Sequence, residues 1–388
     1  MKRSTDRILT THVGSLPRPK AMLDLSSSTS GPPKDKAKYL EVVRQSVKDV
    51  VKRQAEAGID IVNEGEFGKA HWANYIIKRM SGFEYRPDDK REPEFFGSDR
   101  VRFHDFFMEA QGHLMAGAPT EACTGPISYA DRDSIQVAIS ALNDALAEVD
   151  VAEGFMTAVA PASTAYDGVN EYYSSEEEFV FAIADALAEE YKAIHESGLL
   201  VQVDDAVLAN MFDALNSQNP KKYRDWAELR IEALNRALSG IPEDRIRYHV
   251  CFGSWHVPHV CDVELETIID LVLRVNAGAY CIEAANPRHE HEWRVWQKHK
   301  LPEGRILIPG VITHHLVTVE HPRLVADRIV RYAKMLGREN VIAGTDCGFA
   351  QVDTYQRVHP DIMWAKFESL AEGARIATEE LWGRQAAA

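Results

Sequence analysis

Short apolar segments rich in β-branched residues recur along the chain, and amphipathic stretches separate most of them. This alternation is typical of parallel strands joined by crossover helices. The predicted strands are residues 8–15, 59–66, 155–161, 199–205, 247–253, 280–286, 306–312 and 341–347. The predicted helices include residues 39–57, 176–197, 225–238, 264–276 and 321–336. The pattern predicts an α/β protein, a (β/α)8 TIM barrel.

One connection, between the second and third predicted strands, is too long for a simple crossover. Residues 67–154 are therefore expected to form an insertion within a single barrel domain spanning residues 1–388. Residues 83–107 inside it are rich in charges, proline and aromatic side chains, which favours a mobile flap over a site. The segment SSSTSGPPKDK at residues 26–36 predicts a flexible surface loop, and residues 385–388 are expected to fray.

Composition excludes several classes of partner. The 388 residues contain 44 Lys and Arg against 59 Asp and Glu, a net charge of −15, whereas binding to a phosphate backbone needs clustered basic residues. No apolar run approaches the roughly 20 residues that cross a bilayer, and residues 1–11 lack the apolar core of a signal peptide. Five thinly spread cysteines do not fit a disulfide framework. We expect a cytoplasmic protein that binds neither nucleic acid nor membrane, and a homo-oligomer is left open.

Polar side chains follow the predicted strands at their carboxyl ends, where barrel enzymes place catalytic groups. His249 and Cys251 in HVC are two residues apart, so both side chains lie on the same face of a strand. With Glu283 and Cys347 from other strand ends they make a ligand set that suits tetrahedral Zn²⁺. Two thiolates and a carboxylate outweigh the charge of the ion, which favours a nucleophilic thiolate and predicts S-alkylation rather than hydrolysis.

Plain burial competes with metal binding for these residues, because HxC is a short motif and free cysteine is commonly buried. The remaining cysteines are assigned to the core on this ground: Cys123, Cys261 and Cys281. Cys281 nevertheless lies two residues before Glu283 on the same strand face and competes with it as a ligand. His289 and His291 in RHEHEW fit either outer contacts of a metal site or the start of a helix.

HVC, GTDCG and the opening TTHVGSLPR resemble the catalytic barrel of cobalamin-independent methionine synthase and its shorter single-barrel relatives, which include the zinc-dependent epoxyalkane:coenzyme M transferases. The resemblance covers essentially the whole chain, with the motifs in the family's order. It implies a (β/α)8 barrel that binds zinc through His249, Cys251, Glu283 and Cys347.

The resemblance also implies a place for the family's thiol substrate, homocysteine. The corresponding positions are Ser15 in HVGSLPR, Glu66 in NEGEF and Asp204 in VQVDDAV. The carboxylates can receive the substrate ammonium group, and Ser15 can donate to the substrate carboxylate. A histidine that handles a proton in the family corresponds to His321 in VEHPR, and the change to HVGS after the first strand brings His12 to the barrel mouth.

The chain is too short for the additional N-terminal barrel of methionine synthase proper, and APASTAYDGVNEYY lacks the tryptophan on which the family stacks the pterin. Our first hypothesis is a zinc-dependent thiol alkyltransferase, a methionine-synthase-like S-methyltransferase of the 5-methyltetrahydropteroyltriglutamate–homocysteine type, in which the thiolate attacks an activated methyl group of a methyl or alkyl donor.

The second hypothesis is addition of a thiol such as coenzyme M to an epoxide. Arg18 is then the candidate to bind the sulfonate, and a histidine protonates the ring-opened product. The candidate proton donors are His12, His314, His315 and His321. The third hypothesis is a non-catalytic zinc barrel with a binding role.

Overall fold

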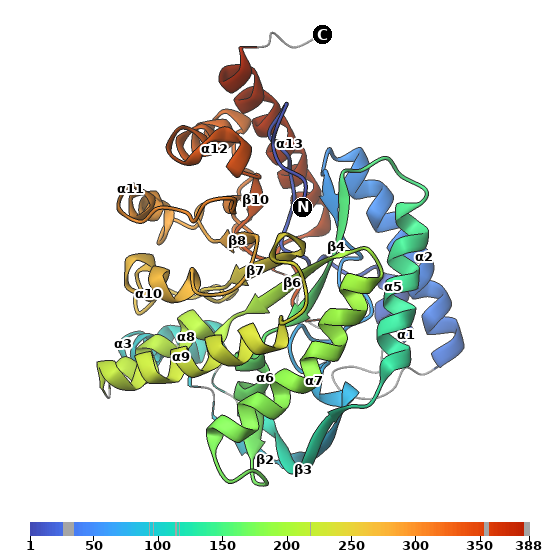
Figure 1. Cartoon of the computed structure of the whole chain (residues 1–388), viewed down its shortest axis with the longest axis vertical. Coiled ribbons are helices and arrows are strands. Elements are labelled where there is room, and N and C mark those ends of the chain that lie inside the picture. Colours follow the sequence, from blue (N-terminus) through green and yellow to red (C-terminus); the bar gives the residue numbers. More distant parts are fainter. Residues whose placement is uncertain are drawn as a thin grey trace.

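A curled parallel sheet with helices packed around its outside forms the centre of the computed structural model (Figure 1). The structure describes residues 1–25, 35–92, 94–95, 97–112, 115, 117–217, 219–352 and 357–383. The strand order is β1-β4-β6-β7-β8-β9-β10. The strands are β1 (Ile61–Val62), β4 (Glu153–Val159), β6 (Leu200–Asp205), β7 (Ile246–Val250), β8 (Ala279–Ile282), β9 (Ile306–Ile312) and β10 (Gly344–Thr345). The predicted α/β class is confirmed, and seven of the predicted strand regions contain a strand of this sheet.

The first predicted strand, residues 8–15, differs from the other seven. It forms single parallel bridges, from Thr10 to Ala343 on one side and from Thr11 to Ile61 on the other. After Thr11 the strand pairing is interrupted, since the amide of Val13 donates to the Thr345 hydroxyl at 3.2 Å. The segment therefore lies between the two outer strands of the sheet without being a regular strand itself.

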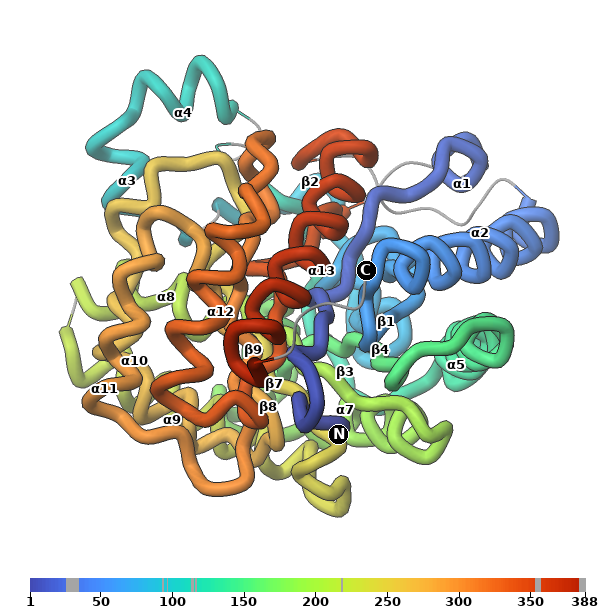
Figure 2. Tube along the Cα trace, turned by 90° about the horizontal axis from the view of Figure 1, so that it is seen from above, coloured from blue at the N-terminus to red at the C-terminus, as the bar shows by residue number. Residues whose placement is uncertain are grey.

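Helices surround the strands when the molecule is seen from above (Figure 2). They are α1 (Lys20–Leu25), α2 (Lys36–Glu56), α3 (Gly97–Arg102), α4 (His104–Ala110), α5 (Arg132–Leu146), α6 (Pro161–Asp167), α7 (Glu176–Glu196), α8 (Val207–Asn216), α9 (Pro220–Ala237), α10 (Leu265–Val272), α11 (Val295–Lys298), α12 (Pro322–Leu336) and α13 (Pro360–Trp382). Short 3₁₀ helices are η1 (Ile77–Arg79), η3 (Glu243–Arg245), η4 (Glu290–Arg294) and η5 (Arg338–Asn340). The five predicted helices correspond to α2, α7, α9, α10 and α12.

Sequence signals at the helix starts explain several of these boundaries. The side chain of Ser175 accepts a hydrogen bond from the amide of Glu178 at the start of α7. α12 and α13 each begin with a His-Pro pair, in which the histidine side chain caps the helix and proline takes the first helical position.

Two apolar cores hold the layers together. The larger one lies between the sheet and the helices, and a smaller one fills the inside of the curled sheet. The buried residues of the smaller core are Leu9, Ile61, Phe155, Leu200, Ala279, Cys281, Ile306, Ile308 and Ile342. Because residues of several strands meet there, the floor of the curled sheet is packed and the opening lies at the carboxyl ends of the strands.

The insertion contributes two strands of a second sheet, the short helices α3 and α4, and the longer helix α5. β2 (Met80–Arg91) pairs antiparallel with β3 (Ala118–Tyr129), and β5 (Gly168–Asn170) adds a third strand. The first part of the predicted flap over residues 83–107 is a strand of this sheet. Its second part is fastened to the body, because Ser98 donates to Asp213 at 2.6 Å and the amide of Val260 donates to Asp99 at 2.9 Å.

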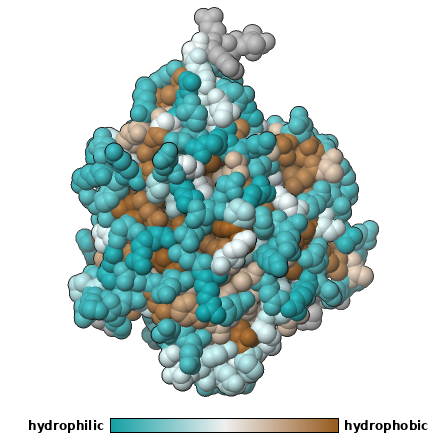
Figure 3. All heavy atoms as spheres, in the orientation of Figure 1, coloured by the Kyte–Doolittle hydropathy of each residue, from teal (hydrophilic) through white to brown (hydrophobic). Residues whose placement is uncertain are grey.

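Of the predicted loop at residues 26–36, residues 26–34 lie outside the described residues, and so do residues 385–388. Hydrophilic side chains cover much of the face seen in Figure 3, with hydrophobic groups between them. Within the described part of the chain, no helix has the length and apolar character needed to cross a bilayer.

Candidate metal centre and thiol pocket

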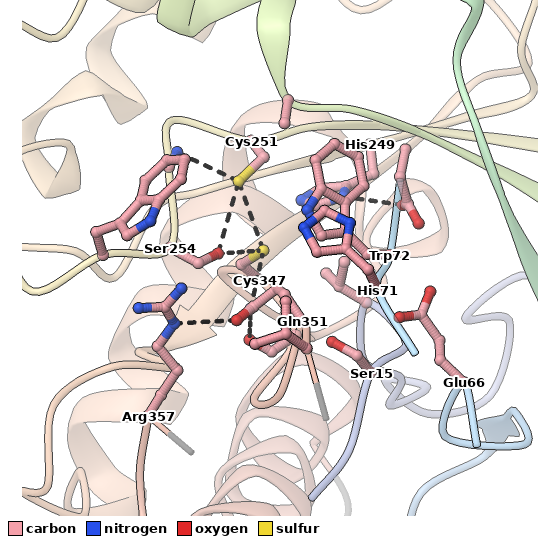
Figure 4. A pocket seen from close by; sticks show the side chains of 17 residues that line it. Ser15, Glu66, His71, Trp72, His249, Cys251, Ser254, Cys347, Gln351 and Arg357 are labelled. Carbon is pink, nitrogen blue, oxygen red and sulfur yellow. Dashed lines mark hydrogen bonds and ion pairs between the residues drawn. The ribbon is translucent and has the colours of Figure 1, made fainter. Parts of the chain in front are cut away.

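Three side chains with metal-ligating atoms meet at the carboxyl ends of β7 and β10. His249 lies on β7, Cys251 follows that strand, and Cys347 follows β10. Their ligand atoms all lie within 4.8 Å of one another, and the two sulfur atoms are 3.6 Å apart (Figure 4). The two-residue spacing of HVC places His249 and Cys251 on one face of a strand. The curl of the sheet brings Cys347 to them, although β8 and β9 lie between β7 and β10 in the strand order.

Asp204 at the end of β6 holds the His249 ring. The Nδ1 atom of His249 lies 3.0 Å from Oδ1 of Asp204, and Nε2 is buried with no hydrogen-bond partner among the described residues. Burial alone would lower the pKa of His249, but the hydrogen bond to Asp204 and the nearby Cys347 raise it well above its ordinary value. With Nδ1–H donated to a carboxylate, Nε2 is the ring atom left to bind a metal.

Cys347 has the environment of a thiolate. The hydrogen bond from Cys251 lowers the pKa of Cys347 well below its ordinary value, and His249 and Ser254 add to this against the effect of burial. Ser254 Oγ lies 2.9 Å from the Cys347 sulfur. Together with the two sulfur atoms, the buried Nε2 of His249 makes a ligand set that fits a borderline-soft ion such as zinc.

Glu283, the fourth predicted ligand, does not join this group in the structure. Its Oε1 accepts from the amide of Phe252 at 3.2 Å and its Oε2 from Asn286 at 3.3 Å. Burial and the nearby Asp346 raise the pKa of Glu283 to about 8. Cys281 also lies outside the group of three candidate ligands. It belongs to the smaller apolar core, where Arg247 Nη2 lies 3.9 Å from its sulfur.

A cavity of about 100 Å³ opens beside the three side chains. It is lined by Val13, Ser15, Glu66, His71, Trp72, Asp204, Ala206, His249, Cys251, Gly253, Ser254, Trp255, Cys347, Gly348, Gln351, Val352 and Arg357. The structure thus brings Ser15, Glu66 and Asp204 to one pocket with the sulfur atoms. Figure 4 shows Ser15 and Glu66 on the side of the pocket away from Ser254. Such a concave site, with a few convergent polar groups, is suited to a small ligand.

Glu66 is fixed by two neighbours on the pocket wall. Its Oε1 accepts from Thr157 Oγ1 at 2.5 Å and from Lys69 Nζ at 3.4 Å. Its backbone adopts a φ of 61°, which is uncommon for a residue with a side chain and is typical of functional positions. Glycine is required nearby, because a Cβ at Gly348 would lie 2.2 Å from Ser15 Oγ.

Two predicted site residues make structural contacts and do not line the pocket. Arg18 is buried and donates to the backbone oxygens of Ala350, Glu66 and Lys69 at 2.8, 3.3 and 2.6 Å, outside the set of residues that line the pocket. His321 is exposed and its Nδ1 accepts from the amide of Arg323, which makes it the N-cap of α12.

His12 lies inside the sheet and does not line the pocket. Its Nε2 contacts Gln54 Oε1 at 2.7 Å, and its Nδ1 accepts from the amide of Gly14 at 3.2 Å. Because Gln54 Oε1 can only accept, the ring is neutral with its proton on Nε2. Burial lowers the pKa of His12 to about 3. Both nitrogens are occupied, so the ring orders the first segment of the chain and is not placed to move a proton.

The buried His12 predicts a stability that falls in acid. The unfolded chain binds a proton at His12 below about pH 6.5, whereas the folded chain does so only near pH 3. Stability is therefore lost as the pH falls through this window, by up to about 1.4 kcal/mol per pH unit. In urea unfolding at about pH 6 and about pH 5, His12→Gln is expected to show a shallower pH dependence of the unfolding free energy than the unaltered protein. An unchanged slope contradicts this, and His104→Gln, at an exposed site, is the matched control.

The remaining histidines singled out by the sequence are not among the residues that line the pocket. The His314 ring is fully buried and lies 4.8 Å from that of His315. His289 is bound to Asp262 at 3.0 Å and to Glu292 at 2.8 Å. The exposed His291 contacts Glu264 at 3.3 Å. These contacts tie together the loops that follow β7 and β8.

Sequence reasoning missed several lining residues. Ser254 and Gln351 lie within four positions of Cys251 and Cys347, so their neighbours in the chain could have indicated them. Trp72 gave no such signal. It reaches the pocket because its amide donates to the Gln351 backbone oxygen at 2.9 Å, a contact between distant segments.

Fold and site together define an α/β protein with a candidate His-Cys-Cys metal centre beside a pocket that contains carboxylates. The family profile described as cobalamin-independent synthase, catalytic domain, matches residues 8–90 and 118–363. The chain belongs to this family, which confirms the resemblance of HVC, GTDCG and TTHVGSLPR. The unmatched stretch between the two ranges contains α3 and α4.

Similar proteins agree with this assignment. Methionine synthase of Thermococcus kodakarensis is 23% identical over 376 residues, covering 96% of this chain and 94% of the relative. Methionine synthase of Saccharolobus islandicus is 23% identical over 380 residues, covering 96% and 95%. The structure of a B12-independent methionine synthase from Shewanella sp. W3-18-1 in complex with selenomethionine has a TM-score of 0.75 at 20% identity, covering 97% of this chain and 100% of that one. At this identity the structural likeness concerns the fold.

Proposed function

We propose that this protein is a zinc-dependent S-methyltransferase that methylates homocysteine or a closely similar amino thiol. The observation that carries the proposal is the His249 ring, held through Nδ1 by Asp204, with its unpartnered Nε2 beside the two sulfur atoms and next to an open cavity. The family and the relatives named methionine synthase support the same reaction class. The methyl donor is a separate small molecule or carrier.

His249, Cys251 and Cys347 would hold the zinc ion. Glu283 would become the fourth ligand after rotation of its side chain. Zinc, when bound, supplies the Lewis acidity that keeps a thiol deprotonated near neutral pH. Asp204 keeps the His249 proton on Nδ1, and Ser254 donates to the Cys347 sulfur. The pocket walls orient the substrate so that its sulfur can meet the methyl carbon in line.

Glu66 and Asp204 form the acidic wall that would receive the substrate ammonium group, and Ser15 would donate to its carboxylate. Lys69 lies 3.4 Å from Glu66 and balances the charge of that carboxylate. One negative charge is then left for one ammonium group, which favours an amino-acid thiol over an uncharged thiol.

Glu66→Gln is expected to weaken homocysteine binding about 10- to 100-fold, because an amide group replaces a carboxylate oxygen that accepts a charge-assisted hydrogen bond. Oε1 of the glutamine can still accept from Thr157 and Lys69, so the wall keeps its shape. The measurement is KM for homocysteine against KM for 4-mercaptobutanoate, which lacks the ammonium group. An equal change for both thiols contradicts the assigned role.

The proposed function is tested by calorimetric titration of homocysteine, and then coenzyme M, into the zinc-loaded protein. Homocysteine binding with proton release, followed by formation of methionine on addition of a methyl donor, is the expected result. Binding of coenzyme M alone would move the assignment to addition of a thiol to an epoxide, with Arg357 on the pocket wall as the nearby cation. Binding of neither thiol would overturn the proposal.

The non-catalytic alternative is less well supported, because the metal ligands adjoin an open cavity and structural zinc sites are usually closed. For the fold, we propose that residues 8–15 complete an eight-stranded barrel, and that residues 1–388 are one domain with the insertion at 67–154.

A further inference from the structure

Two buried carboxylates join the three chain segments that carry the candidate ligands. Glu283, after β8, accepts from the amide of Phe252, the residue after Cys251. Asp346, the residue before Cys347, accepts from the amides of Ala284 and Ala285, both at 2.8 Å. The segments after β7, β8 and β10 are therefore connected in a row through side-chain to backbone hydrogen bonds.

Asp346 is enclosed on every side. It is 0% exposed, and its own amide donates to the Ile312 backbone oxygen at 3.1 Å. Gly310 on β9 leaves the space that the carboxylate occupies, because a Cβ there would lie 2.1 Å from Asp346 Oδ1. The backbone of Asp346 is bound to β9, its side chain is packed against Gly310, and its Oδ1 holds the turn that follows Glu283, so Asp346 fixes that turn relative to Cys347.

We infer that Asp346 is a positioning residue for the metal centre, which sets the separation between the Glu283 carboxylate and the Cys347 sulfur. The inference rests on the proposed function only in taking His249, Cys251 and Cys347 as the metal ligands. With the backbone of Ala284 and Ala285 held, Glu283 can reach the group by rotating its side chain away from Phe252. Without Asp346 the whole turn is released, and the fourth ligand is no longer presented at a fixed distance.

Groups outside the ligand set that orient the ligands of a metal site typically change metal affinity 10- to 100-fold when they are removed. Asp346→Ala is therefore expected to weaken zinc binding by about that factor, measured by competition with a chelator. In the Co²⁺-loaded protein, the visible absorption bands should shift as the carboxylate ligand is lost, a readout independent of turnover. Asp346→Asn keeps an oxygen acceptor for the two amides, so it is expected to bind zinc within about threefold of the unaltered protein.

Asp205 offers a matched control at the same end of the sheet. It is also a buried aspartate, and it accepts from the amides of Val207 and Leu208 at 3.2 and 3.1 Å, but it is not joined to the Glu283 turn. Asp205→Ala is expected to lower thermal stability while leaving zinc affinity within about threefold. Equal losses of zinc affinity in Asp205→Ala and Asp346→Ala would overturn the inference.

If Asp346→Ala does not fold, Asp346→Asn tests whether Asp346 positions the metal centre. Retained zinc affinity, with the amides of Ala284 and Ala285 still protected from hydrogen exchange, supports positioning through hydrogen bonds. A loss of tenfold or more with these amides still protected assigns the effect to the charge of Asp346 and overturns the inference. Because zinc and cobalt binding are measured without thiol or methyl donor, failure of the proposed methyl transfer would leave this test intact.

Discussion

Cys347→Ala is expected to abolish metal binding and methyl transfer together. Cys347 is the thiol whose pKa is lowered well below its ordinary value, and it contacts both Cys251 and Ser254. Its removal leaves only His249 and Cys251 of the gathered group, which cannot hold zinc in a tetrahedral site without Glu283 and a fourth ligand. We expect a loss of turnover on the order of a thousandfold or more, with zinc content falling in proportion.

The matched control for this variant is Cys261→Ala. Cys261 is partly buried near Asp99 and Asp213, outside the metal group. This control should retain both zinc and activity, measured by elemental analysis and by methionine formation. Full activity in a zinc-free Cys347→Ala protein would refute the mechanism, because the thiol would then be activated by something other than the metal.

Asp204→Ala is expected to weaken zinc binding about 10- to 100-fold and to weaken homocysteine binding as well. Asp204 holds Nδ1 of His249, and it also accepts from Gln202 at 2.8 Å and lines the pocket. Alanine leaves the ring free to rotate and to place its proton on Nε2, the atom that we propose binds the metal. Zinc affinity by chelator competition and homocysteine affinity by calorimetry separate the two effects.

Asp204→Asn provides the comparison. Its Oδ1 can still accept from both Gln202 and His249, so zinc affinity should fall much less than in Asp204→Ala. The lost charge should still weaken binding of the substrate ammonium group. If both variants bound zinc as tightly as the unaltered protein, Asp204 would have no part in orienting His249.

The order of strands and helices could be predicted from the sequence because it depends on local periodicity. β-branched segments predicted the regions of β4, β6 and β9, and capping residues such as Ser175 accounted for helix starts. The two-residue spacing of His249 and Cys251 predicted a shared face, since alternation along a strand is a local property. The location of site residues at strand ends followed from the same pattern.

The orientation of the site side chains and their hydrogen-bond partners depend on contacts between distant parts of the chain. The local sequence does not distinguish the buried His12, which contacts Gln54 and Gly14, from a histidine at the mouth of the barrel. It also does not distinguish Arg18, which donates to backbone oxygens, from an arginine that binds substrate. His321 became a helix cap because Pro322 begins α12.

The α/β alternation, the family and the residue types of the candidate metal centre could be predicted from the sequence alone. The tertiary structure decided which side chains share the pocket: Trp72 enters it through a backbone contact with Gln351, while Glu283 is held away from the sulfur atoms by Phe252 and Asn286. The physical reason is that periodicity fixes the face on which a side chain lies, whereas hydrogen bonds and packing across the sheet fix what that face meets.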